Sequence, residues 1–312
     1  MTDETSVTEA DAPASAERGS APVSGMNHIQ LAALSAVLAG VLAGGAAVGP
    51  IGTLVAVAVL QAVLVPTWVL GNALPGRIGA VILGLLAAAG ADTAVMHWHS
   101  SGYSPVLGVL AVAIPLMFAH QLTRGVVRTR VVESLAGITV LVVATVAAAG
   151  LIVLRYQADG RTISLAVAGA LGVALVVAHL TDAVLPTPRF DPSMDRGLPA
   201  VLLGVIAGGA VGYLVSRNLL DFVGGRSAFV GAAIGAVGCL LSIGTSFADP
   251  DASKLRAPAA AETASTEPEE ADLVPVREPS ARLARLRPGG AVALTIALTI
   301  PAAYVLVNAL TS

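Results

Sequence analysis

Polar side chains that could do chemistry gather in one short part of the chain, around residue 190. His179 and Asp182 stand three residues apart, so on a helix they share one face and the carboxylate could orient the imidazole. The polar turn at 186–199 adds four more charged residues, Arg189, Asp191, Asp195 and Arg196. With Asp oxygens on Mg²⁺ and Arg on phosphate, this candidate polar cluster would suit phosphoryl chemistry. We favour the plainer interpretation, a solvated turn with ion pairs and an interfacial histidine, and assign it no metal and no cofactor.

Nine apolar segments must position these residues. Hydrophobic residues make up 55% of the 312 residues, charged residues make up 12%, and the mean hydropathy is +0.82, which excludes a soluble domain. A helix of about 20 residues crosses the roughly 30 Å hydrocarbon core of a membrane. We therefore predict an all-α polytopic integral membrane protein with about nine transmembrane helices, at 30–48, 51–71, 78–96, 105–121, 132–154, 162–185, 199–215, 228–248 and 289–309. The first two are separated only by Gly49 and Pro50 and are too long together for one span, which favours a hairpin.

Charge concentrates in two segments outside the spans. Residues 1–27 contain five acidic residues and one basic residue, and residues 249–287 contain eight acidic and six basic residues. Both segments have little apolar surface to bury, so we predict that both are disordered. The chain thus divides into an acidic tail (1–27), eight spans (28–248), a loop (249–288), and the ninth span with the C-terminus (289–312).

The loop ends in a short basic run. Arg282, Arg285 and Arg287 directly precede the last span. They suit contact with anionic lipid headgroups, at about 1 kcal/mol per basic residue near the surface. Simple anchoring of the span by positive charge explains them at least as well.

The basic residues also set the expected orientation, because cytoplasmic loops carry the excess of Lys and Arg. With the N-terminus inside, 13 of the 17 basic residues fall in cytoplasmic segments and only Arg155, Arg161, Arg217 and Arg226 fall outside. We predict a cytoplasmic N-terminus, an outside C-terminus, and cytoplasmic positions for the 186–199 turn and the 249–288 loop. With 16 Arg, one Lys and abundant Ala, Gly and Val, the composition indicates a bacterial protein and hence a bacterial plasma membrane.

Few polar residues interrupt the spans. Gln61 lies near the middle of the second span, five residues before Pro66, and we expect it to satisfy backbone carbonyls that the proline frees. Asp92 lies near the outer end of the third span, followed by His97 and His99. A His-x-His pair with an acid could hold a metal, but no further His or Cys in the outer loops completes a four-ligand shell. We therefore expect these side chains to be interfacial.

Three spans carry glycines four residues apart, a spacing that places small residues on one helix face and lets backbones approach. They are Gly40 and Gly44 in the first span, Gly204, Gly208 and Gly212 in the seventh, and Gly231 and Gly235 in the eighth. We predict that the seventh and eighth spans pack tightly and form a rigid platform.

The C-terminal half resembles the CDP-diacylglycerol synthase (phosphatidate cytidylyltransferase) family in its order of elements. A span bearing Asp182 is followed by a polar loop, a Gly-rich span, a further span, a cytoplasmic segment, and a Pro-Gly-Gly at 288–290 that opens the last span. The resemblance implies lipid-headgroup chemistry with Mg²⁺ and a nucleotide. The family's catalytic signature is degenerate here, because the Pro-Gly-Gly lacks the family's His and Asp-Arg pair, Thr245 stands where the family has Asp, and the 186–199 turn has no Lys. The resemblance therefore implies a non-catalytic relative.

Three functions fit these observations. We favour a non-catalytic membrane anchor or scaffold in cell-envelope growth or division, which binds protein partners through the 1–27 tail and the 249–288 loop. Disordered segments dock on binding, and the membrane confines them. The first alternative is a CDP-diacylglycerol-synthase-like enzyme using Mg²⁺, and the second is a small-solute transporter with Gln61 and Pro66 as its candidate site. The sequence contains no nucleic-acid-binding motif, so the expected partners are the lipid bilayer and proteins.

A reporter fusion tests the predicted orientation. Because the basic residues favour a C-terminus outside the cell, a reporter that is active only in the cytoplasm should give no signal when it is fused after Ser312. The same reporter inserted in the 249–288 loop should be active. Comparable activity of the two fusions at matched protein levels would contradict the nine-span orientation.

Overall fold

A computed structural model of the protein describes residues 27–123, 131–185, 187–190, 196–219, 224–247 and 281–311. The acidic tail before Asn27, most of the 249–288 loop, and both Asp191 and Asp195 lie outside these ranges. The disorder predicted for the tail and the loop therefore stays a prediction.

Helices build the described part of the chain, and nine helical spans there are long and apolar enough to cross a membrane. The nine predicted segments are confirmed as apolar helical spans, with boundaries shifted by a few residues. The spans are α1 (His28–Val48), α2 (Pro50–Gly71), α3 (Arg77–His97), α4 (Ser104–Leu122), α5 (Val131–Ala148) continued by α6 (Gly150–Arg155), α7 (Gly160–Val184), α8 (Leu198–Leu219), α9 (Gly224–Phe247), and α12 (Arg287–Thr311), which α11 (Ala281–Ala284) precedes. A 3₁₀ turn, η1 (His99–Ser101), connects α3 to α4.

The first two spans form the predicted hairpin. Gly49 separates them with a φ of 143°, a conformation that glycine adopts readily and other residues rarely do. Pro50 then opens α2, where its missing N–H costs no helical hydrogen bond. Next to the turn, a Cβ atom added to Gly45 would lie 2.5 Å from the Gly52 carbonyl oxygen, so the two helices approach each other at their glycines.

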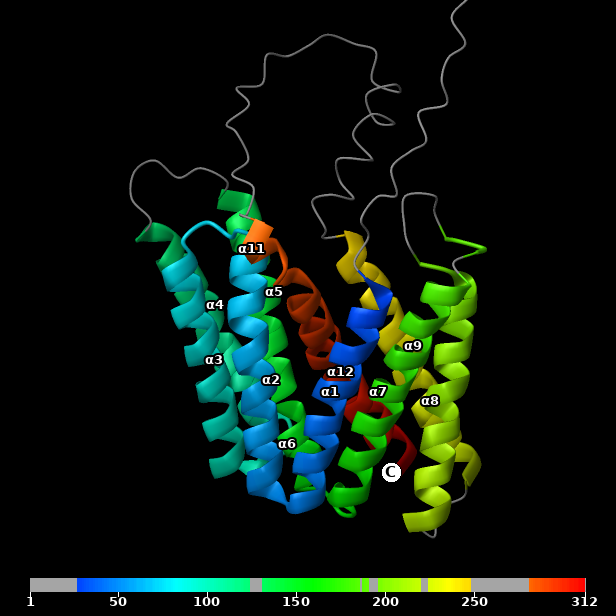
Figure 1. The fold of residues 1–312 in the computed structure, drawn as a ribbon. Coiled ribbons are helices and arrows are strands. Elements are labelled where there is room, and N and C mark those ends of the chain that lie inside the picture. Colours follow the sequence, from blue (N-terminus) through cyan, green and yellow to red (C-terminus); the bar gives the residue numbers. More distant parts are fainter. Residues whose placement is uncertain are drawn as a thin grey trace, which may run out of the picture.

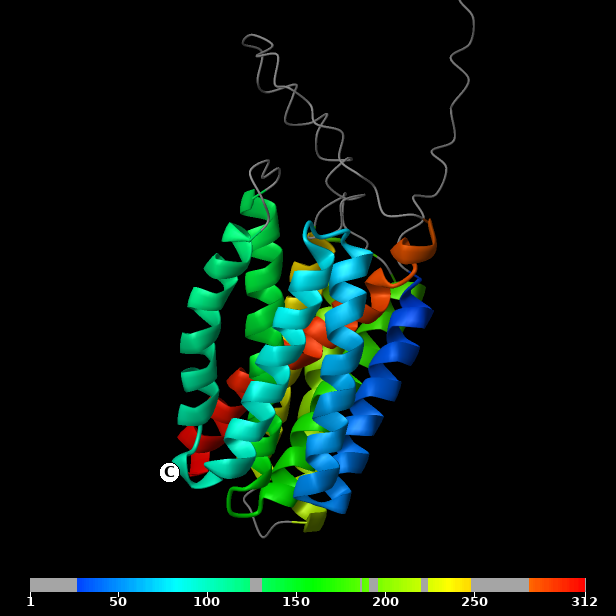
Figure 2. The same cartoon turned by 90° about the vertical axis from the view of Figure 1, so that its left-hand side faces the viewer.

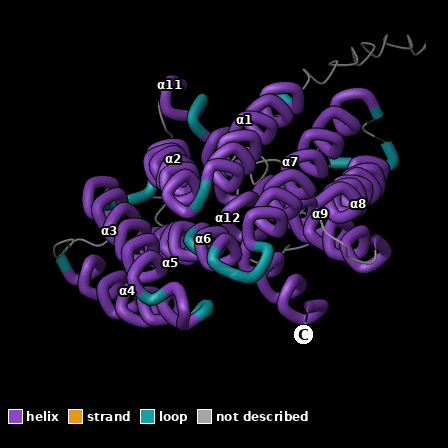
Figure 3. The backbone as a smooth tube through the Cα atoms, turned by 90° about the horizontal axis from the view of Figure 1, so that it is seen from below, coloured by secondary structure: helices purple, strands orange, loops and turns teal. Residues whose placement is uncertain are grey.

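The helices form two groups with α12 between them (Figure 1). One group contains α2, α3, α4 and α5, and the other contains α1, α7, α8 and α9. The α12 helix contacts α2 and α5 in the first group and α1 and α9 in the second. Figure 2 shows it crossing the bundle obliquely, and Figure 3 shows it near the centre when the bundle is seen from below. The α12 helix and the α1–α2 hairpin therefore join the two groups.

The two ends of the bundle, upper and lower in Figure 1, carry different segments. The upper end holds the start of α1, the last residues of α7 and α9, and α11. The lower end holds the α1–α2 turn and the last residues of α12. The first and last described helices therefore begin and end at opposite ends of the bundle, as an odd number of spans requires. Which end faces the cytoplasm stays a prediction.

Glycines line the contact between α8 and α9. A Cβ atom added to Gly208 would lie 2.6 Å from the Gly231 carbonyl oxygen, and one added to Gly235 would lie 3.1 Å from the Gly204 carbonyl oxygen. Ordinary contacts of a Cβ atom are 3.4–4 Å long, so these backbones approach to distances that only glycine permits. The predicted tight packing of the seventh and eighth spans is confirmed.

The glycine pair of α1 has a different environment. A Cβ atom added to Gly40 or Gly44 would meet no described atom within 4 Å. Within the described residues, the four-residue spacing therefore accompanies a close helix contact in α8 and α9 but not in α1, where Gly45 makes the contact instead.

Substitution of the α8 glycine should loosen this helix pair. In Gly208→Val the new side chain would overlap the α9 backbone, so we expect a loss of about 1–3 kcal/mol in unfolding free energy, measured as a lower thermal midpoint in detergent. Gly44→Val is the matched control because it makes the same change in open space, and its effect should stay within about 0.5 kcal/mol. Equal midpoints for the two variants would contradict the packing role of Gly208.

Candidate functional site

A short backbone hairpin connects α7 to α8 and places Arg196 at the upper end of the bundle. Arg189 pairs with Gly197 in an isolated antiparallel bridge. On either side of it, the Phe190 N–H donates to the Arg196 carbonyl at 3.3 Å and the Leu198 N–H donates to the Pro188 carbonyl at 2.9 Å. We call the two paired segments of this hairpin, 188–190 and 196–198, the neck. In the neck the Arg189 side chain is exposed and the Arg196 side chain is buried.

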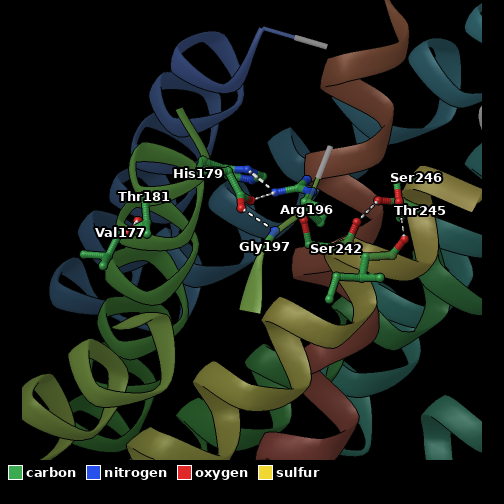
Figure 4. A network of polar contacts seen from close by, with 10 residues as sticks. Val177, His179, Thr181, Arg196, Gly197, Ser242, Thr245 and Ser246 are labelled. Carbon is green, nitrogen blue, oxygen red and sulfur yellow. Dashed lines mark hydrogen bonds and ion pairs between the residues drawn. The ribbon is translucent and has the colours of Figure 1, made fainter. Parts of the chain in front are cut away.

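Arg196 connects three parts of the upper end. Its Nη1 group donates to His179 Nδ1 at 2.6 Å and to Asp182 Oδ2 at 3.1 Å, and its Nη2 group donates to Ser242 Oγ at 2.9 Å. His179 and Asp182 belong to the last turns of α7, and Ser242 belongs to α9. Figure 4 shows the guanidinium lying between His179 and Ser242. The neck is thereby fastened to two helices by one side chain.

Asp182 has both carboxylate oxygens engaged. Oδ2 accepts from Arg196, and Oδ1 accepts from the Gly197 N–H at 2.9 Å. The relative exposures of Asp182 and Arg196 are 3% and 5%, so the pair is removed from water. Burial of either charge alone would cost several kcal/mol. Each residue therefore depends on the other for a stable place in the interior.

His179 is a neutral imidazole in this arrangement. A guanidinium has donors and no acceptor, so Nδ1 of His179 must accept from Arg196 and the ring proton sits on Nε2. The ring of His28, the first residue of α1, lies 6.4 Å from the His179 ring between centroids. We refer to His28, His179, Asp182, Arg196 and Ser242 as the Arg196 cluster.

Three members of the Arg196 cluster have the geometry of potential metal ligands. His28, His179 and Asp182 each offer one ligand atom, and these atoms lie within 4.8 Å of one another. However, Arg196 donates to two of the three residues, and a divalent cation would have to share the space with its positive charge. The charge that neutralises Asp182 is already supplied by the chain. The arrangement fits a buried ion pair better than a metal centre. The favoured interpretation, a solvated turn with ion pairs and an interfacial histidine, predicts the ion pair correctly. It is wrong about the solvation of His179, Asp182 and Arg196, which are only 1%, 3% and 5% exposed.

The structure brings together only part of the candidate polar cluster. His179, Asp182 and Arg196 meet, Arg189 lies on the exposed side of the neck, and Asp191 and Asp195 lie outside the described residues. The expectation that Asp182 orients the His179 ring is wrong, because the two share a helix face but both bind Arg196. His28 and Ser242 were not predicted. Their only sequence signal is that each stands near the upper end of its own span.

The three arginines of the basic run, Arg282, Arg285 and Arg287, also have different environments. Arg282 and Arg285 are exposed, and their contact with lipid headgroups stays a prediction. Arg287 Nε instead donates to the Gly71 carbonyl at 3.0 Å, where the last carbonyls of α2 lack helical partners. A Cβ atom added to Gly290 would lie 3.2 Å from the Trp68 backbone nitrogen. This start of α12 is therefore built for close packing against α2.

Thr245 makes a local bond at the position where the resembling family has an acid. Its hydroxyl donates to the Ser242 carbonyl at 2.8 Å, within α9. The hydroxyl thus returns to its own helix, as is common for Thr in helices.

A second buried polar group lies in the other half of the bundle. Gln61 Nε2 donates to Asp92 Oδ1 and to the Thr145 carbonyl, both at 3.0 Å. The Thr145 carbonyl needs a partner because the Ala149 N–H, at the break between α5 and α6, donates to Val146 instead. The expectation that Gln61 serves carbonyls freed by Pro66 is therefore wrong. The carbonyl it satisfies belongs to another helix.

The residues near the end of α3 have different environments, and the interfacial position expected of the histidines stays a prediction. His97 and His99 are exposed. The His97 ring meets the edge of Trp98 at 4.9 Å, and the His99 ring stacks on Tyr156 at 4.3 Å. Asp92 differs, since it is buried beside Gln61.

Variants of the Arg196–Asp182 ion pair test whether this pair stabilises the fold. In Arg196→Gln, the Asp182 charge loses its partner, so we expect a loss of about 3–5 kcal/mol in unfolding free energy. Adding Asp182→Asn should restore part of that loss, since no uncompensated charge remains. The measurement is the thermal midpoint in detergent.

Arg189→Gln provides the control on the exposed side of the same neck, with an expected change within about 0.5 kcal/mol. An Arg196→Gln protein as stable as this control would show that the ion pair does not hold the upper end together.

Comparisons of this chain with protein-family models, with curated proteins and with solved structures found no match. The resemblance to CDP-diacylglycerol synthases therefore stays an expectation from the residues.

Proposed function

We propose that this protein is a non-catalytic multi-pass anchor of a bacterial plasma membrane. It presents the 1–27 tail and the 249–288 loop to soluble protein partners on the cytoplasmic side. Cell-envelope growth or division is the setting that such an anchor would serve. The observation that carries the proposal is the position of the Arg196 cluster between the start of α1, where the tail joins the bundle, and the end of α9, where the loop begins.

The cluster has one member beside each of these two positions. His28 directly follows the tail, and its ring lies 6.4 Å from that of His179. Ser242 stands in the last turns of α9, just before the loop, and is bonded to Arg196. His179 and Arg196 therefore lie between His28, at the start of α1, and Ser242, in the last turns of α9. The start of α1 and the last turns of α9 therefore lie beside the same buried polar group.

A fixed separation matters for binding. Two short segments held side by side reach a shared partner with a high effective concentration, so individually weak contacts combine. The membrane body then needs no chemistry of its own. It needs rigidity at the attachment points, which the buried ion pair and the glycine contact of α8 with α9 supply.

In the enzyme alternative, Asp182 would be the main metal ligand among the described residues, but both of its carboxylate oxygens already accept hydrogen bonds. A Mg²⁺ site prefers carboxylate oxygens that are free to bind the metal, whereas Asp182 gives one oxygen to Arg196 and the other to the Gly197 N–H. Phosphate binding would need Arg196, whose guanidinium is bonded to Asp182, His179 and Ser242. The polar side chains of the Arg196 cluster therefore bond to one another and not to a metal or a phosphate.

One observation favours the transporter alternative. Gln61, Asp92 and the Thr145 carbonyl join α2, α3 and α5 inside the bundle, and buried polar groups at membrane depth mark ion and substrate pathways in many proteins. This group lies in the helix group opposite to the Arg196 cluster. A polar group at this place is compatible with an anchor.

Deletion of the two segments tests the anchor. Separate deletions of residues 2–26 and 257–276 should each impair growth or cell shape in the native host, since each removes one binding segment, while membrane levels stay at wild type. The matched control is Gly44→Val, which leaves both segments in place.

Two results would contradict the anchor proposal. The first is wild-type behaviour of both deletions together with loss of function in His179→Ala/Asp182→Ala at equal membrane level. The second is turnover of CTP and phosphatidate with Mg²⁺ by the purified protein, abolished in Asp191→Asn, which would establish the enzyme alternative.

A further inference from the structure

Asp92 is a buried carboxyl group without a balancing charge. Its relative exposure is 5%, close to that of Asp182, but its environment is different. Asp182 is paired with Arg196, whereas Asp92 has a single bond from the neutral amide of Gln61. No other hydrogen bond or ion pair to Asp92 exists within the described residues.

The ionisable groups on the surrounding elements stand at the helix ends. The α3 helix packs against α2, α4, α5, α6 and η1, and α2 contains no ionisable residue. The ionisable residues on the others, and on α3 itself, are Arg77 and His97 on α3, His120 on α4, Glu133 on α5, Arg155 on α6 and His99 on η1. None of them bonds to Asp92 in the described structure, so an ionised Asp92 would be compensated by one amide alone.

An isolated charge in such a place costs several kcal/mol, and a carboxyl group avoids that cost by taking up a proton. We propose that Asp92 is a proton-binding site inside the bundle, which exchanges its proton with the aqueous phase at the lower end. This inference is independent of the anchor proposal, because it concerns the opposite helix group.

The route to the lower end is short. Met96 lies four residues after Asp92 on α3 and so shares its face, about 6 Å further along the helix axis. Together with Leu54, Thr93 and His97, Met96 lines a surface depression between α2 and α3. One helical turn therefore separates the Asp92 carboxyl from a hollow that opens at the helix end.

Gln61 sets the strength of proton binding. Its amide must present nitrogen to both neighbours, because the Thr145 carbonyl can only accept. The same nitrogen donates to Asp92 Oδ1, and a donated hydrogen bond favours the ionised carboxylate over the acid. This geometry also disfavours a metal cation at Oδ1, since the amide oxygen faces away from the carboxylate.

A hydrophobic carbodiimide reports the protonated carboxyl. The carboxyl proton moves to a carbodiimide nitrogen, the carboxylate oxygen bonds to the central carbon, and the O-acylisourea rearranges to a stable N-acylurea that mass spectrometry locates. With the full chain in liposomes and dicyclohexylcarbodiimide as the probe, Asp92 should be labelled at about pH 6 and labelling should fall at least tenfold by about pH 9. Asp182, equally buried but paired with Arg196, should stay unlabelled throughout.

Gln61→Leu tests whether the hydrogen bond from Gln61 to Asp92 controls the pH at which Asp92 is labelled. Loss of the amide donor should move the midpoint of labelling upward by about one pH unit, the equivalent of about 1.4 kcal/mol. Gln121→Leu is the matched control, because it removes a different buried amide, bonded to Ser134, and should leave the midpoint unchanged. Folding of each variant is checked by gel filtration.

Three results would overturn the proposal. These are a folded wild-type protein with no label on Asp92 at about pH 6, labelling that does not fall with rising pH, and labelling suppressed by Na⁺ but not by choline at constant pH. The last result would identify a cation site instead of a proton site. Equal midpoints for Gln61→Leu and wild type would remove Gln61 from the site.

Discussion

The upper end of the protein depends on one constraint, that a charge placed in a low-dielectric interior needs an opposite charge and full hydrogen bonding. Arg196 meets this constraint with Asp182, His179 and Ser242, and Asp182 meets it with Arg196 and the Gly197 N–H. The partners come from α7, α9 and the neck between α7 and α8. The electrostatic requirement thus becomes a structural one, because three segments must stay in register for the pair to remain satisfied.

Close helix packing makes that register possible. Hydrophobic burial provides little drive between helices in lipid, so contacts form where small residues let backbones approach. A Cβ atom added to Gly204 would lie only 2.7 Å from the Cys239 sulfur, and Cys239 stands about one turn before Ser242 on α9. The glycine face of α8 therefore brings α9 near enough for Ser242 to reach Arg196. The polar cluster and the glycine contact support each other.

The sequence predicts the spans well because a helix that crosses a membrane needs about 20 consecutive apolar residues, and such segments stand out in the hydropathy of the sequence. It also predicts that His179 and Asp182 share a face, since helix geometry fixes residues three apart. It does not reveal which arginine of the 186–199 turn points inward, because the backbone bridge between Arg189 and Gly197 decides this. His28, Ser242 and the Gln61–Asp92 bond were missed for a related reason. These contacts join distant segments, and one sequence carries no signal for the pairing of helices.

The two buried acids show how a bundle can use the same residue type in opposite ways. Asp182 has a fixed counter-charge in Arg196, and its effect is to hold α7, α9 and the neck together. Asp92 has no such partner among the described residues, so the only neutralising group at hand is a proton, whose presence depends on the surroundings. The first acid lies at the upper end beside the attachment points of the tail and the loop, and the second lies in the α2–α5 group. Between them lies α12, which packs against both α2, the helix of Gln61, and α9, the helix of Ser242.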